Sequence, residues 1–194
     1  FICAPTLWLG ASDHHRSFFA LSVAETTYVS VLSEICASVA EAGFGKLYIV
    51  NGHGGNTAPL RVAIANLRKS APELLIATAD YWALAADQLR KNRASPPGGA
   101  AHAGEIETSL MMHLAPQLVR TDLLEPSVPD VPEGYEIDLI DGGATALYAP
   151  WDELSKKGHL GVPTVSDGNH GKRFYDASVS AVAQSLLRFH EFSL

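Results

Sequence analysis

The sequence has few cysteines, no apolar run of membrane-spanning length and no excess of basic residues. Two cysteines in 194 residues are too few for a disulfide-stapled secreted scaffold, so we expect a reduced, cytoplasmic protein. No apolar run approaches the roughly 20 residues that a spanning helix needs, so we expect no membrane span. Lys and Arg total 14 against 21 for Asp and Glu, a formal net charge of −7. This charge disfavours nucleic acid or an anionic membrane as a partner, because the phosphates of both would be repelled.

What remains is the composition of an ordinary globular chain. Hydrophobic residues make up 47% and charged residues 18%, which is enough apolar material for the core of one domain. The chain opens Phe-Ile-Cys-Ala-Pro, without an initiating Met or a signal-peptide pattern, as if it began inside a strand. No repeat and no long linker divides it, so we expect a single domain over residues 1–194.

The apolar pattern of the first half predicts a βαβ unit. One helical face is formed by Tyr28, Val31, Leu32, Ile35, Cys36 and Val39. Gly43 stands where a helix C-terminal cap belongs. Short apolar runs at residues 47–50 and 74–77 predict two strands, and residues 58–69 between them predict a helix. Such a unit implies a parallel strand pair with a right-handed crossover.

The second half predicts fewer regular elements. Residues 93–103 are rich in Ser, Pro, Gly and Ala and predict a loop, followed by a helix at about 104–114. Residues 125–135, with three prolines, predict an irregular excursion on the surface. We expect a strand at 144–148, a loop at 160–170 and a helix from about 173 to 192. The fold class is therefore α/β.

The loop at residues 51–56, Asn-Gly-His-Gly-Gly-Asn, is a candidate ligand site. It follows a strand end, where ligands gather in open α/β sheets. Its glycines let a ligand approach the backbone closely, which makes Gly54 and Asn56 candidates for substrate contact. His53 is placed to bind a metal or to move a proton, and the alternative is a histidine that only caps a tight turn.

A second candidate is the segment at residues 102–109, His-Ala-Gly-Glu-Ile-Glu-Thr-Ser. Helical geometry places Glu107 within the apolar face and points Glu105 the opposite way. That face is formed by Ile106, Leu110, Met111 and Leu114. A carboxylate on a core-facing stripe needs a cation, so Glu107 either binds a metal or forms a buried ion pair with an arginine. His102, just before the helix, is a candidate acid/base group.

Two other features are less decisive. His14 and His15 are adjacent, and because neighbouring side chains point apart on most backbones, we expect that they do not serve one site together. Trp82 follows the strand predicted at 74–77. It is either a wall of a substrate pocket or a plain core aromatic.

Taken in order, these motifs resemble the creatininase (creatinine amidohydrolase) family. The resemblance spans most of the chain, from Gly10 and His15 through the two motifs to the Gly-Val-Pro-Thr at residues 161–164. It implies a three-layer α/β/α sandwich with a mostly parallel sheet, in a homo-oligomer that is often hexameric. It also implies a hydrolase that cleaves the C–N bond of a small-molecule amide with two divalent metals, zinc with manganese or zinc alone. An N/O ligand set also suits iron.

Residue by residue, the resemblance implies that His53 binds one metal and Glu107 the other. It makes His102 the proton shuttle to the leaving nitrogen and places Trp82 at the substrate pocket. The metals would activate a water for attack on the amide carbonyl.

The chain also departs from the family pattern. The family places a Glu-x-His pair and a bridging Asp ahead of the region where this chain begins, so we expect an N-terminal truncation. His53 and Glu107 alone do not complete a two-metal site, and Asp13, His14 and His15 follow residues 8–10 rather than preceding them. Gly98 replaces a family Trp, and Phe-Phe-Ala-Leu at 18–21 replaces Phe-Pro-Gly-Thr. The expected substrates are therefore cyclic amides, formamides or small peptide-like molecules rather than creatinine.

Two other functions remain open at this point. A non-catalytic relative, kept as an assembly or small-molecule-binding subunit, would explain the incomplete metal site. A nucleotide-binding domain is disfavoured, because Thr57 stands where a dinucleotide fingerprint has its third glycine and no Lys-Ser/Thr pair follows.

Overall fold

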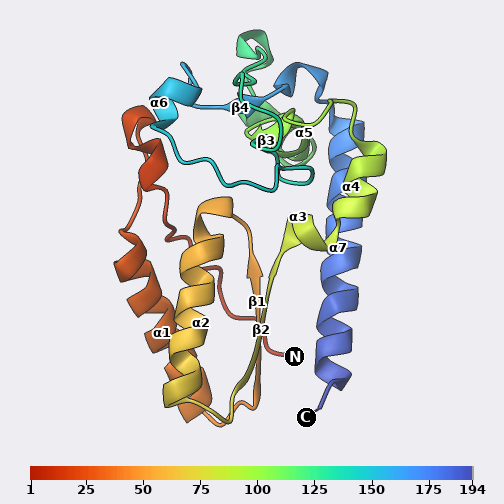
Figure 1. Ribbon diagram of the computed structural model, residues 1–194. Coiled ribbons are helices and arrows are strands. Elements are labelled where there is room, and N and C mark those ends of the chain that lie inside the picture. Colours follow the sequence, from red (N-terminus) through yellow and green to blue (C-terminus); the bar gives the residue numbers. More distant parts are fainter. Residues whose placement is uncertain (194) are drawn as a thin grey trace. The chain divides into compact units, whose positions relative to one another are not determined.

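The computed structural model describes residues 1–193 and divides the chain into two compact units (Figure 1). The first contains residues 1–80 and the C-terminal residues from Phe189, and the second contains Tyr81–Arg188. Each is described by itself. The single domain expected over residues 1–194 stays a prediction.

The first unit is built on the βαβ motif that the apolar pattern predicts. Its elements are η1 (Asp13–Phe18), α1 (Glu25–Glu41), β1 (Lys46–Asn51), η2 (Gly54–Asn56), α2 (Thr57–Ser70) and β2 (Leu75–Asp80). Strands β1 and β2 are parallel, in a register that runs from Lys46 opposite Leu75 to Asn51 opposite Asp80. This register brings the ends of both strands, and the loops that follow them, to one edge of the sheet.

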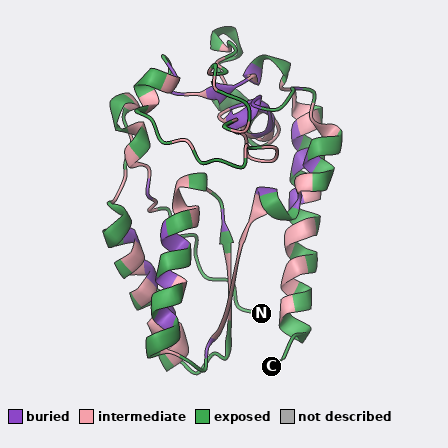
Figure 2. Ribbon diagram, in the orientation of Figure 1, coloured by how far each residue is buried: buried purple, intermediate pink, exposed green. Residues whose placement is uncertain are grey.

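Helices α1 and α2 lie side by side (Figure 1), and their buried residues meet in one apolar cluster (purple in Figure 2). The cluster is formed by Tyr28, Leu32, Leu60 and Ala63. Gly43 follows α1 with φ +85°, the left-handed conformation of a helix cap, as the sequence predicts.

The C-terminal residues of the first unit are fastened to the start of β1. The Lys46 ammonium donates hydrogen bonds to the backbone carbonyls of Phe189, His190 and Phe192. The last backbone carbonyls of a helix have no hydrogen-bond donor within the helix, and a positively charged side chain can supply one.

The second unit is mostly helical. Its longer helices are α4 (Ala86–Asn92), α5 (Glu105–Leu114) and α7 (Gly168–Glu191). The end of α7, from Phe189 on, belongs to the first unit. Its short elements are α3 (Tyr81–Leu84), η3 (Pro116–Leu118), η4 (Thr121–Leu123), α6 (Trp151–Leu154) and η5 (Pro163–Val165). Strands β3 (Ala100–His102) and β4 (Leu160–Gly161) pair antiparallel. The core consists of Trp82, Ala85, Leu89, Ala100, Ile106 and Phe174.

Three local predictions in this unit are wrong. Residues 100–102 and 160–161 form a short strand pair instead of loops, because Ala100 and Gly161 meet in antiparallel register. No strand forms at 144–148, where Tyr148 is 91% exposed. Helix α7 begins at Gly168 rather than near 173, because the Asp167 carboxylate accepts the backbone N–H groups of Asn169 and His170 and caps the first turn.

Among the helices of residues 1–193, none is both long enough and apolar enough to cross a membrane.

Candidate functional site

The loop that carries His53 is anchored by a hydrogen-bond network at the ends of β1 and β2. The Asn51 side-chain amide, 4% exposed, donates to Asp80 Oδ1 at 2.6 Å and to the His53 carbonyl at 2.9 Å. The Thr57 hydroxyl donates to the same Asp80 oxygen at 3.0 Å. The His53 backbone N–H donates back to Asn51 Oδ1 at 3.2 Å. One buried amide therefore fixes both ends of the peptide that presents the His53 imidazole.

Three imidazoles converge in the first unit. One ligand atom from each of His14, His15 and His53 lies within 4.8 Å of the other two. The His14 and His53 rings are nearly parallel, 9° apart with centroids at 5.8 Å, and the His14 and His15 centroids are 4.1 Å apart. The expectation that the two adjacent side chains would point apart is therefore wrong, whereas whether they serve one site stays a prediction. Both histidines lie in the 3₁₀ turn of η1, and their rings meet there at 53°.

Close approach of two backbone segments makes this convergence possible. The Ala11 N–H donates to Asn56 Oδ1 at 2.9 Å and ties the segment before η1 to the loop after β1. A Cβ on Gly55 would lie 2.3 Å from the Ala11 carbonyl oxygen, 2.9 Å from His14 Cε1 and 3.0 Å from His53 Cε1. Gly55 therefore leaves room for the residues before η1, and these residues donate a hydrogen bond to the side-chain oxygen Oδ1 of Asn56.

The electrostatics of the cluster favour neutral imidazoles. Burial lowers the pKa of His53, and the neighbouring His14 lowers that pKa further. Burial also lowers the pKa of His14, against the opposing effect of Asp13 and Glu25. A neutral imidazole is the form that binds a metal, and nitrogen donors suit zinc and similar transition metals. The donor set of this cluster therefore fits a divalent ion of that kind.

In the second unit, His102 ends β3 and its ring meets the Trp151 ring edge to face, with centroids 5.5 Å apart and planes at 88°. The next residue, Ala103, has φ +47°, which is strained for a residue with a Cβ. Glu107 Oε2 accepts the Ala103 N–H at 2.6 Å, and the Thr108 hydroxyl donates to the Ala103 carbonyl at 3.0 Å. The two side chains hold the strained peptide beside His102.

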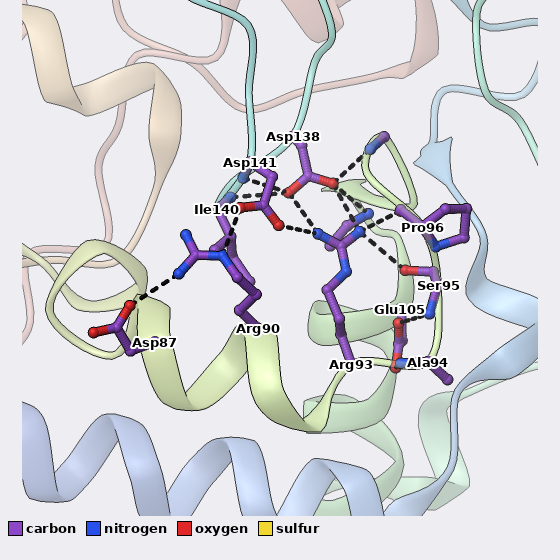
Figure 3. A network of polar contacts seen from close by, with 12 residues as sticks. Asp87, Arg90, Arg93, Ala94, Ser95, Pro96, Glu105, Asp138, Ile140 and Asp141 are labelled. Carbon is purple, nitrogen blue, oxygen red and sulfur yellow. Dashed lines mark hydrogen bonds and ion pairs between the residues drawn. The ribbon is translucent and has the colours of Figure 1, made fainter.

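The two carboxylates of α5 lie in different surroundings. Glu105, expected to face away from the core, is 0% exposed and accepts the N–H groups of Ala94 and Ser95 at 2.7 Å each (Figure 3). The sequence interpretation of Glu105 is wrong because the 94–99 loop folds over the polar side of α5. Glu107 is partly buried, and burial raises its pKa against the opposing hydrogen bond from Ala103.

The arginine ion pair considered for Glu107 is made elsewhere. Arg93 is 5% exposed and pairs with the fully buried Asp138 at 2.9 Å and with Asp141 at 3.1 Å (Figure 3). Asp138 also accepts backbone N–H groups from Gly98 and Ala100, at 2.8 and 3.2 Å. This network, which the sequence did not reveal, ties the loop before β3 to the turn at 138–141.

Two of the remaining candidates differ in their surroundings. Trp82 is 8% exposed, packs in the core of the second unit and meets Tyr81 edge to face at 5.2 Å. It has the setting of a core aromatic. Gly54 is exposed, with no atom within 4 Å of where a Cβ would stand. The roles assigned to His53, Glu107, His102, Trp82, Gly54 and Asn56 stay predictions.

Comparison with known proteins decides the family. The family model of creatininase, described as creatinine amidohydrolase, matches residues 1–186. The chain belongs to the creatininase family. A mycofactocin precursor peptide peptidase from Mycobacterium ulcerans is 31% identical over 188 residues, which cover 94% of this chain and 66% of that protein. The chain therefore spans just under two thirds of that relative's length.

Solved structures confirm the creatininase-like α/β fold class. A Bacteroides fragilis protein provisionally named creatinine amidohydrolase superposes with a TM-score of 0.78 and 26% identity, covering 96% of this chain and 71% of that one. A mutant creatininase of the Zn-Zn type superposes with a TM-score of 0.70 and 18% identity, covering 92% of this chain and 70% of that one.

Proposed function

We propose that this protein is a metal-dependent amidohydrolase that cleaves the C–N bond of a cyclic amide, a formamide or a small peptide-like substrate. The observation that carries the proposal is the His53 imidazole, whose pKa is lowered by burial and whose backbone is anchored at a strand end in a creatininase-family chain. The peptidase name of the mycobacterial relative favours the peptide-like class.

In this proposal His53 and Glu107 are metal ligands, and two divalent ions, zinc or manganese, remain the expected cofactors. A bound divalent ion supplies Lewis-acid polarisation of the carbonyl and a water that deprotonates near neutral pH. Glu107 also orients the peptide after His102 through its bond to the Ala103 N–H.

His102 delivers a proton to the leaving nitrogen. An amide nitrogen is a poor leaving group unless it is protonated as the C–N bond breaks, and a histidine side chain within hydrogen-bond reach can act as that general acid. The edge contact with Trp151 limits the rotation of the ring, so the proton-bearing nitrogen keeps one direction.

The test is release of free amine from a panel of cyclic amides, N-formyl amines and short peptides by the metal-loaded protein. We expect turnover that a chelator abolishes and that added zinc or manganese restores. Substituting His53→Ala or Glu107→Gln lowers kcat/KM at least about 100-fold, because each removes a metal ligand.

His113→Ala is the matched control, since His113 lies in α5 with its ring beside Tyr175 and outside the histidine cluster. Turnover that persists in both ligand variants and in chelator would overturn the proposal.

A further inference from the structure

The histidine cluster contains two residues that the proposed function leaves without a role. His14 and His15 come from η1, whereas His53 comes from the loop after β1, about 40 residues later. All three belong to the first compact unit. We propose that His14, His15 and His53 together bind one divalent transition-metal ion, zinc by preference, with no ligand from the second unit. Binding of this ion does not depend on the proposed function. Only the assignment of the ion as one of the two metals of the hydrolase rests on it.

The geometry of the cluster is close to that of a three-nitrogen site. A tetrahedral zinc ion with Zn–N bonds of about 2.0–2.1 Å needs its nitrogens roughly 3.3 Å apart. The ligand atoms here already lie within 4.8 Å of one another, so modest rotations about the side-chain bonds bring them to an ion. Three protein ligands leave a fourth position open, as in catalytic rather than structural zinc sites.

The backbone around the cluster is fixed from several directions. Ser12 donates its N–H to the Ser22 hydroxyl at 2.8 Å, and the His15 N–H donates to the Ser12 carbonyl at 2.9 Å. The bond from Ala11 to Asn56 then holds this turn against the His53 loop. The loss of conformational freedom on metal binding is therefore confined to the three side chains, which raises the affinity of the site.

The donor types select the metal. Three imidazoles suit zinc, copper, iron or nickel, whereas manganese and magnesium prefer carboxylate and water oxygens. The acidic residue next to the cluster in sequence, Asp13, pairs its carboxylate with Arg16 at 3.2 Å. The site therefore discriminates in favour of zinc and against manganese.

The experiment measures metal binding directly on the full chain. Protein stripped with a chelator is titrated with Zn²⁺, Mn²⁺ and Co²⁺ by calorimetry, and the visible absorption of Co²⁺ reports four-coordination. We expect the ion held by the three histidines to be bound much more tightly when it is zinc than when it is manganese. His14→Ala and His15→Ala are each expected to lower the affinity for that ion at least about tenfold, since each substitution removes one of three nitrogen ligands. Glu107→Gln and His113→Ala leave the affinity of this ion unchanged.

A second measurement uses the unsubstituted protein, in case a variant fails to fold. Diethyl pyrocarbonate modifies accessible imidazoles, and mass spectrometry locates the modified residues. Zinc is expected to protect His14, His15 and His53 while leaving His113 unchanged. Equal modification of His14 and His15 with and without zinc would overturn the three-histidine site.

The two proposals fail in different ways. If His53→Ala and Glu107→Gln lose the ion but His14→Ala and His15→Ala keep it, the three-histidine site is wrong and the hydrolase proposal stands. If the His14 and His15 variants lose zinc but the loaded protein hydrolyses no amide, the three-histidine site stands and the hydrolase proposal fails.

Discussion

Asn51 and Asp80 face each other across the last register position of the parallel strands, and the Asn51 amide donates to the Asp80 carboxylate at 2.6 Å. Neither side chain belongs to the histidine cluster, yet the same amide donates to the His53 carbonyl. The position of the His53 imidazole therefore depends on a carboxylate at the end of the neighbouring strand. Metal ligands are commonly oriented by such supporting hydrogen bonds.

Asp80→Ala is expected to weaken zinc binding by about 10- to 100-fold, the usual effect of removing a supporting partner. It also lowers the free energy of unfolding by about 1–3 kcal/mol, because the buried Asn51 amide loses an acceptor. Calorimetric zinc titration and urea unfolding measure the two effects. Asp87→Ala removes an exposed carboxylate paired with Arg90 and serves as the control; equal zinc affinity in both variants would contradict this role for Asp80.

Gly55→Ala is expected to open the histidine cluster. The added methyl group would meet the Ala11 carbonyl oxygen at 2.3 Å, so the segment carrying His14 and His15 must move away from His53. We expect a loss of about 1–3 kcal/mol in unfolding free energy, typical of overpacking, and a marked fall in zinc affinity. Gly52→Ala is the matched control, because a Cβ there meets no atom within 4 Å. Normal zinc binding by the Gly55 variant would show that the close approach is dispensable.

The Asp138–Arg93 pair predicts a stability loss in acid. Burial alone would raise the pKa of Asp138, but hydrogen bonds from Arg93 and from the backbone N–H groups of Ile140 and Asp141 outweigh it and hold the pKa below its usual value. A depressed folded-state pKa stabilises the protein above the unfolded-state value, near 3.9, and this contribution disappears as pH falls through the folded-state value.

Asp138→Asn should therefore cost about 3–5 kcal/mol near neutral pH, because the buried Arg93 loses its charged partner. The difference from the unsubstituted protein should shrink once the pH falls below about 4. Urea unfolding across this pH range measures it, with Asp87→Asn as an exposed control. A difference that stays constant down to the lowest pH would contradict the depressed pKa.

Ala103→Gly is expected to stabilise the second unit by about 0.5–1 kcal/mol, since glycine adopts a positive φ without the strain of a Cβ. Ala101→Gly, two residues earlier in β3, should instead destabilise by about 0.5–1 kcal/mol, because glycine weakens regular structure. Thermal unfolding distinguishes them by the opposite signs of their Tm shifts. A lower Tm for the Ala103 variant would mean that Glu107 and Thr108 impose no strained conformation there.

Local patterns explain which parts could be predicted from the sequence. The βαβ unit and α5 follow from short continuous apolar runs for the strands and an apolar period of 3.6 residues for the helices, both of which short windows of sequence contain. His53 is identified from the sequence because its loop follows the end of a predicted strand. The convergence with His14 and His15 was missed, since it depends on the bond between Ala11 and Asn56, 45 residues apart. The available signal was a histidine pair together with a glycine-rich loop, but no local rule brings them together.

The burial of Glu105 and the ion pair of Arg93 do not follow from the sequence, for a related reason. A helical wheel shows which residues share a face, but it does not show that a later or earlier loop covers the polar face. The 94–99 loop covers Glu105 by donating two backbone N–H groups to it. The Arg93 partner lies 45 residues away along the chain. Composition identified 93–103 as a loop but gave no indication that it would be buried.

Lys46 holds the end of α7 to the start of β1 through its side-chain hydrogen bonds, so a chemical change at this one lysine would affect both segments. The carbonyls of Phe189, His190 and Phe192 accept hydrogen bonds from an ammonium group that lies 143 to 146 positions earlier in the chain. Acetylation of Lys46 would remove the positive charge of its side chain and release residues 189–192 from the start of β1.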